Sequence, residues 1–192
     1  MRHTPVPDAA PVRRIVTVLI ASGIAVFMLS PVLKSARAAF QAAAFLFLSA
    51  GIYITVRYLM TSFSYAVLPR GDAVDDGTVS AAVGAFHVRH LPPSSLDFVV
   101  TKSQGQRIGI TEARLSMDEL LYFGTLAQKG AKKEILKRHP SARLYNYTVS
   151  LRPNAYIAVF EDSAGSQIGI VFEPDAAMAE YFADTAEKNR MK

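Results

Sequence analysis

The residues best suited to bind a ligand form a basic run within "KGAKKEILKRHP", residues Lys129–Pro140. Its cations are Lys129, Lys132, Lys133, Lys137 and Arg138, followed by His139, and Glu134 is the one acid among them. The run reads as a short helix that Pro140 ends. An anionic membrane leaflet attracts such clusters by about 1 kcal/mol per basic residue near the surface. The run therefore predicts a contact surface for anionic lipid headgroups or a protein partner. The alternative is an ordinary solvated helix face.

No catalytic pattern accompanies this run. The sequence has no G-x-x-x-x-G-K-[ST] or G-x-G-x-x-G phosphate loop and no G-x-S-x-G nucleophile elbow. His87 and His90 lie three residues apart, but no further ligand pattern completes a metal site. The adjacent acids Asp75–Asp76 and Glu161–Asp162 lie beside turns, where water normally solvates them. We therefore predict no catalytic residue, no metal and no cofactor. An enzyme without a recognisable motif is the alternative.

Two long apolar runs precede the rest of the chain. Ile15–Leu33 and Ala38–Val56 contain no charged residue, and each approaches the roughly 20 residues that cross a bilayer core. A short polar turn, Lys34–Arg37, separates them. This pattern predicts a transmembrane helical hairpin over residues 14–61, preceded by a tail of residues 1–13. Small residues along both runs indicate close packing within the hairpin, with oligomerisation as the alternative.

A cleaved signal peptide is the alternative interpretation of the first run. Arg13 and Arg14 would form its basic region, and "ARA" (Ala36–Ala38) resembles a cleavage site. The first run is long for such a signal, and the second run would still hold the protein in the membrane. We therefore favour the hairpin.

Charge separates the two parts of the sequence. Residues 1–61 contain six Lys or Arg and one acid, whereas residues 62–192 contain 15 of each sign. The net charge of +5 thus belongs to the membrane flanks, and no nucleic-acid partner is expected. Cations outside the two spans outnumber those in the turn, which predicts that both termini and the domain are cytoplasmic. The outer cations are Arg2, Arg13, Arg14 and Arg57, against Lys34 and Arg37 in the turn.

Residues 62–192 predict a small β-rich domain. Tyr58–Leu68 either begins it as a strand or prolongs the second span, and residues 69–95 have the composition of a long loop or linker. Two pairs of strand-like runs flank glycine turns, and each pair predicts an antiparallel hairpin. The pairs are Leu96–Ser103 with Gln106–Leu115, and Ala155–Asp162 with Ser166–Pro174. Arg143–Leu151 alternates as a further strand.

The domain is expected to end in a helix over Asp175–Asn189. Asp175 has the position of an N-cap, and Met178, Tyr181 and Phe182 share one face. Ser116 stands three residues before Glu119, which is the spacing of a capping box. About six antiparallel strands, one internal helix and this closing helix fit a small sandwich or barrel covered by a helix.

Both predicted hairpins contain an Ile-Gly-Ile sequence. Because side chains alternate along a strand, Ile108 and Ile110 are expected on one face, in the core, and Ile168 and Ile170 likewise. Gly109 and Gly169 then lie on the opposite faces, where a missing side chain admits a neighbouring chain.

Five short stretches carry a resemblance to a known group. They are "LDFVVTKSQGQR" (Leu96–Arg107), "ARLS" (Ala113–Ser116), "RLYNYTVSL" (Arg143–Leu151), "VFED" (Val159–Asp162) and "FEPD" (Phe172–Asp175). In these stretches and in the placement of its two spans, the chain resembles a group of uncharacterised bacterial membrane proteins with a pleckstrin-homology-like (PH-like) domain. The resemblance implies a membrane-anchored α+β protein of the bacterial plasma membrane. Its hairpin would precede a PH-like antiparallel β-sandwich or barrel with a C-terminal capping helix.

The resemblance does not extend to phosphoinositide binding. In eukaryotic PH domains that affinity lies in a basic loop between the first two strands. Here residues 69–95 carry Asp72, Asp75 and Asp76 against Arg70 and Arg89. We therefore expect a non-enzymatic, membrane-anchored binding or scaffolding protein, integral to the bilayer through two spans. An accessory subunit, recruited to a larger membrane complex through its hairpin, is the alternative.

Overall fold

The computed structural model describes residues 1–6, 8–32, 36–70, 95–104, 109–128, 130–151, 153–162 and 164–191. Its contacts divide the chain into two compact units. One unit combines residues 1–5 with residues 62–192 and is called the domain below. The other, residues 6–61, is called the hairpin. The first five residues thus belong to the same unit as residues 62–192.

The hairpin consists of two packed apolar helices, α1 (Ala9–Leu29) and α2 (Arg37–Thr55), and a π-helical turn, Val56–Met60, that prolongs α2. Both helices are long and apolar enough to be membrane spans. Small residues let them approach closely: a β-carbon on Gly23 would lie 3.0 Å from Leu48 Cγ, and one on Gly51 would lie 3.2 Å from Ile20 Cγ1. The predicted packing within the hairpin is therefore confirmed.

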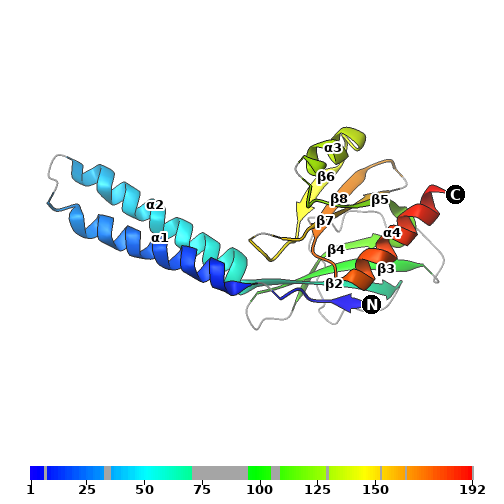
Figure 1. The fold of residues 1–192 in the computed structure, drawn as a ribbon, viewed down its shortest axis with the longest axis horizontal. Helices are drawn as coiled ribbons and strands as arrows, with labels where there is room; N and C mark the ends of the chain where they lie inside the picture. Colours follow the sequence, from blue (N-terminus) through cyan, green and yellow to red (C-terminus); the bar gives the residue numbers. More distant parts are fainter. Residues whose placement is uncertain are drawn as a thin grey trace. The chain divides into compact units, whose positions relative to one another are not determined.

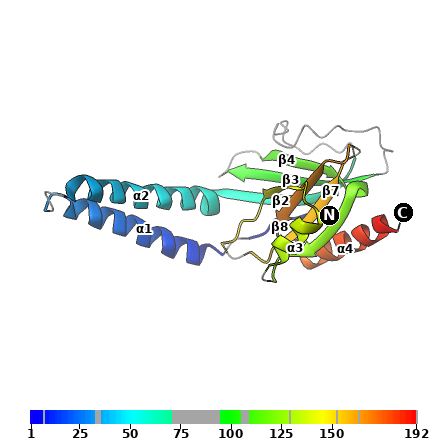
Figure 2. The same ribbon diagram turned by 90° about the horizontal axis from the view of Figure 1, so that it is seen from above.

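The described residues of the domain form two four-stranded sheets (Figures 1 and 2). The first sheet has the order β1-β2-β3-β4, with strands Arg2–His3, Thr61–Pro69, Leu96–Gln104 and Ile110–Ser116. The second has the order β5-β7-β8-β6, with strands Leu120–Thr125 (β5), Arg143–Asn146 (β6), Tyr156–Glu161 (β7) and Gln167–Phe172 (β8). The domain also contains the helices α3 (Ala131–Arg138) and α4 (Ala176–Arg190).

The main core lies between the two sheets and α4. Phe98 of β3 stacks on Phe160 of β7 with ring centroids 6.1 Å apart, and Phe182 of α4 meets Phe98 edge-on at 5.0 Å. The Asp175 carboxylate accepts a hydrogen bond from the Met178 backbone N–H at 2.8 Å and caps α4. Met178 and Phe182 are fully buried. The predicted closing helix, its cap and its apolar face are therefore confirmed.

A second, smaller core lies on the other face of the second sheet. Ile135 of α3 packs there in one buried cluster with Ile157 and Val159 of β7, while Ala158 and Phe160 of β7 belong to the main core. Because neighbouring strand residues point to opposite faces, β7 is apolar at successive positions. It therefore has an inner face toward the first sheet and an outer face toward α3.

The structure refines three local predictions, which concern the direction of β6, the element after Ser116 and the segment after α2. The β7–β8 hairpin is confirmed, with Gly165 at φ 78° in its turn, but β6 pairs with β8 in parallel, not antiparallel. Ser116 caps only a single 3-10 turn, Met117–Glu119, by accepting a hydrogen bond from Asp118 N–H at 3.3 Å, and β5 follows at once. The segment after α2 is divided: the π-turn ends at Met60 and β2 begins at Thr61.

The prediction for the isoleucine pairs is confirmed in one hairpin and wrong in the other. Ile168 and Ile170 are buried, whereas Ile110 is 45% exposed. Ala113 and Leu115 occupy the core face of β4, and strand alternation then points Ile110 away from the core. Ile108 and its turn glycine, Gly105, lie outside the described residues.

Candidate functional site

The predicted basic run forms α3, an eight-residue helix on the outer face of the second sheet (Figure 1). Gly130 at φ 91° occupies its N-cap. Ile135 faces the domain and is buried, whereas Lys132, Lys133, Lys137 and Arg138 are exposed. These four exposed cations are called the basic surface below. Lys129, the fifth predicted contact residue, lies outside the described residues.

The cations of the basic surface differ in their partners. Arg138 Nη2 donates to Glu134 Oε1 at 2.7 Å, and both side chains are more than half exposed. No described carboxylate forms an ion pair with Lys132, Lys133 or Lys137. Glu134 thus neutralises one of the four charges, and three lysines keep theirs available to an external anion. A docked helix presents these charges at fixed spacing, whereas a flexible tail would not.

A buried ion-pair cluster in the domain was not anticipated. Asp97 of β3 is 3% exposed and accepts a hydrogen bond from Arg114 Nε at 2.8 Å, while Arg70 Nε lies 3.5 Å from its other oxygen. The Arg70 backbone N–H also donates to the Ser95 carbonyl at 2.9 Å. These contacts tie together three strands, because Arg70 directly follows β2 and Arg114 belongs to β4. Sequence reasoning missed the cluster, and its one signal was an acid inside the otherwise apolar run "LDFVV".

Glu119 extends this polar region. Burial raises the pKa of the Glu119 carboxyl above its ordinary value of 4.5, and nearby Asp162, Asp97 and Asp118 raise it further, while Arg70 opposes them. Asp162 itself accepts hydrogen bonds from the backbone N–H groups of Ala164 and Ser166, both at 2.8 Å. The cluster therefore has a structural explanation, because its ion pairs hold neighbouring strands of the first sheet together.

Among the remaining acids and histidines singled out from the sequence, the structure describes only Glu161. Glu161 accepts a hydrogen bond from Gln167 Nε2 at 2.7 Å on the β7–β8 hairpin. His87, His90 and Asp75–Asp76 lie outside the described residues. Within the described ranges, no group of three His, Asp or Glu side chains is placed to hold a metal ion.

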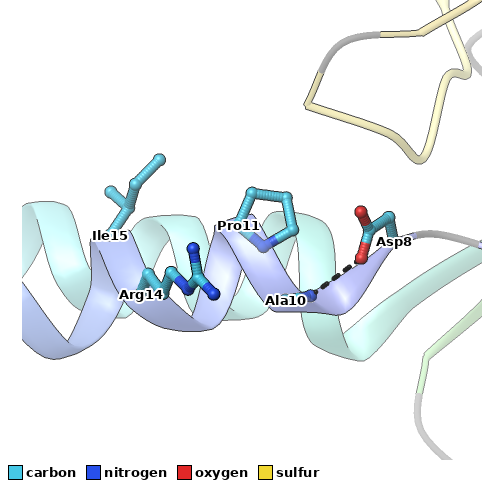
Figure 3. Close-up of a pocket in the computed structure, with 5 residues that line it drawn as sticks. All are labelled: Asp8, Ala10, Pro11, Arg14 and Ile15. Carbon is cyan, nitrogen blue, oxygen red and sulfur yellow. Dashed lines mark hydrogen bonds between the residues drawn. The ribbon is translucent and has the colours of Figure 1, made fainter.

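An open depression lies at the start of α1 (Figure 3). It is lined by Asp8, Ala10, Pro11, Arg14 and Ile15. Asp8 uses Oδ1 to accept the Ala10 backbone N–H at 3.1 Å as the cap of α1, so its role there is structural. The lining holds neither a nucleophile with a base nor a pair of acids, which are the minimum for acyl transfer or acid–base chemistry.

No protein-family model, no curated protein and no solved structure matches this chain. The resemblance to two-span bacterial proteins with a PH-like domain therefore stays a prediction, and the candidate site is the basic surface of α3.

Proposed function

We propose that this chain is a non-enzymatic binding protein, anchored in the bacterial plasma membrane by its hairpin, whose α3 basic surface contacts anionic lipid headgroups. One observation carries the proposal: three exposed lysines, which have no ion-pair partner in the part of the chain that the structure describes, lie on a helix packed against the second sheet. A protein held at a membrane by its own spans meets the leaflet at a high effective concentration. Three lysines at about 1 kcal/mol each then favour the bound state by about 100-fold.

The same proposal places the domain on the cytoplasmic side. Strand β1 precedes the hairpin and pairs with β2, which follows it. Two spans return the chain to the side from which it left, so both strands meet there. The flanking cations Arg13, Arg14 and Arg57 favour the cytoplasmic side by the positive-inside rule. Cleavage after Ala38, as in the signal-peptide alternative, would remove β1 from its sheet, which argues for the hairpin.

Vesicle sedimentation tests the lipid contact directly. The test protein joins residues 1–5 to residues 62–192 through a short Gly/Ser linker, so that β1 is retained, and circular dichroism verifies its fold. We expect it to sediment with phosphatidylglycerol vesicles and not with phosphatidylcholine vesicles. Lys132→Gln, Lys133→Gln and Lys137→Gln together should lower the affinity by about 100-fold.

A matched control removes charge elsewhere. Lys188 and Arg190 are exposed on α4, and Lys188→Gln with Arg190→Gln should leave sedimentation unchanged. Equal losses in both variants would show that only net charge matters. Equal binding of the triple variant and the unmodified protein would contradict the proposal.

A further inference from the structure

The first residues of the chain are built into the domain. Met1 and Val67 exchange two backbone hydrogen bonds, at 3.1 and 2.8 Å, and Arg2 and His3 lie opposite Ala66 and Tyr65. His3 Nδ1 also lies 3.4 Å from Asp175 Oδ2, on the residue that caps α4. The backbone of β1 is thus held to β2, and one of its side chains is held to the cap of α4.

The order of the elements makes the β1–β2 pairing depend on how many times the chain crosses the membrane. β1 ends at His3, α1 and α2 follow, and β2 begins only at Thr61. The hairpin is therefore inserted between two hydrogen-bonded neighbours of one sheet. An even number of spans brings β2 to the side where β1 already lies. If α2 alone crossed the bilayer, β1 and β2 would lie on opposite sides of it.

We infer that the β1–β2 pairing couples the stability of the domain to the topology of the hairpin. With both spans inserted, β1 supplies hydrogen-bond partners to backbone groups along part of the edge of β2, and His3 contacts the residue that caps α4. With one span inserted, that stretch of β2 loses its backbone partners, and an unpaired strand edge is a site of aggregation and proteolysis. The domain thereby distinguishes a correctly inserted chain from a half-inserted one. This inference rests on membrane insertion of the hairpin, which is part of the proposed function.

Engineered thiols report the pairing in the full-length chain, because the sequence contains no cysteine. Met1 and Val67 exchange hydrogen bonds, so Arg2 and Ala66 form the next, non-hydrogen-bonded pair, with α-carbons about 4.5 Å apart. That spacing allows a disulfide. Arg2→Cys with Ala66→Cys should therefore lose nearly all maleimide-reactive thiol when isolated membranes are oxidised. Arg2→Cys with Pro69→Cys is the matched control, since three residues along a strand add about 10 Å and exclude the bond.

Two replacements of α1 then separate topology from sequence. A Gly/Ser segment of equal length leaves α2 as the single span, and a Leu/Ala segment of equal length restores two spans. Only protein that resists carbonate extraction is scored, so that a failure of membrane insertion is recognised separately. We expect the Arg2→Cys/Ala66→Cys disulfide to be lost with Gly/Ser and to return with Leu/Ala. Proteolysis of the domain should accelerate about tenfold with Gly/Ser only, because the backbone hydrogen bonds between β1 and β2 are lost.

Each remaining outcome would overturn the inference. A disulfide that forms equally in the single-span chain would show that the pairing does not depend on topology. A disulfide that stays absent with the Leu/Ala span would show that the specific sequence of α1, and not the number of spans, is required. Unchanged proteolysis in the single-span chain would show that the pairing does not stabilise the domain.

Discussion

Leu144 occupies the space that a β-carbon on Gly169 would fill. The two residues are opposite one another in the parallel β6–β8 pair, and the Leu144 side chain lies against the bare α-carbon of Gly169. Leu144 is also part of the cluster beneath α3. The glycine of the second Ile-Gly-Ile sequence therefore admits a neighbouring side chain, which helps to build the support of the basic surface.

Gly169→Ala should destabilise the domain by about 1 kcal/mol, because the far end of the Leu144 side chain must move to admit the new methyl group. The free energy of unfolding is measured by urea titration of the test protein that joins residues 1–5 to residues 62–192. Leu144→Ala in the same protein should relieve part of this cost, so that the double variant is more stable than the two single changes predict. Strict additivity would contradict the contact.

Asp97→Asn should cost about 2–4 kcal/mol of unfolding free energy, because two arginines lose their shared buried carboxylate. Glu134→Gln is the matched control, since it breaks an exposed ion pair on α3 and should cost less than about 0.5 kcal/mol. The same unfolding measurement applies to both. Similar losses in the two variants would show that the Asp97 cluster is no stronger than a surface pair.

Glu119→Gln should stabilise the domain at neutral pH. Burial raises the pKa of the Glu119 carboxyl, so the folded state binds its proton more tightly than the unfolded state does. The contribution of the Glu119 carboxyl to the free energy of unfolding is then largest below its ordinary pKa of 4.5. This contribution is lost as the pH rises through the raised pKa of the folded state. Thermal unfolding from pH 4 to pH 7 should show a gain for Glu119→Gln that vanishes at the acidic end. A gain at every pH would point to a cause other than ionisation.

Elements with one dominant signal could be predicted from sequence. The two long apolar helices follow from uncharged apolar runs, α4 from the N-cap Asp175 and its apolar face, and the β7–β8 hairpin from its glycine turn. In each case the information lies within a few neighbouring residues. Local propensity and local structure agree there, so no distant contact was needed to decide between alternatives.

Features set by distant contacts could not be predicted. The strand β1 is two residues long and becomes a strand only because β2 lies beside it after 57 intervening residues. The parallel direction of β6 depends on where β8 lies, and "RLYN" contains no information about direction. The exposure of Ile110 follows from the alternation of Ala113 and Leu115, which outweighs the apparent repeat of Ile-Gly-Ile.

The sequence shows that the run is basic, but it does not show which of its cations are paired with an acid. The sequence shows Glu134 among the cations without showing which of them it neutralises. The structure assigns it to Arg138 and leaves the three lysines on the exposed side of α3. The Asp97 cluster was missed because its two arginines lie 27 residues before and 17 residues after that carboxylate in the chain.

Lipid contact by the intact protein is measured most directly with a single fluorophore beside α3. Gln128 is exposed two residues before the N-cap Gly130, so a label on Gln128→Cys reports the approach of the basic surface to a bilayer carrying a headgroup quencher. In nanodiscs containing phosphatidylglycerol we expect strong quenching, weakened by salt and lost on changing Lys132, Lys133 and Lys137 to Gln. Equal quenching in phosphatidylcholine nanodiscs, or in the triple variant, would contradict lipid binding by α3.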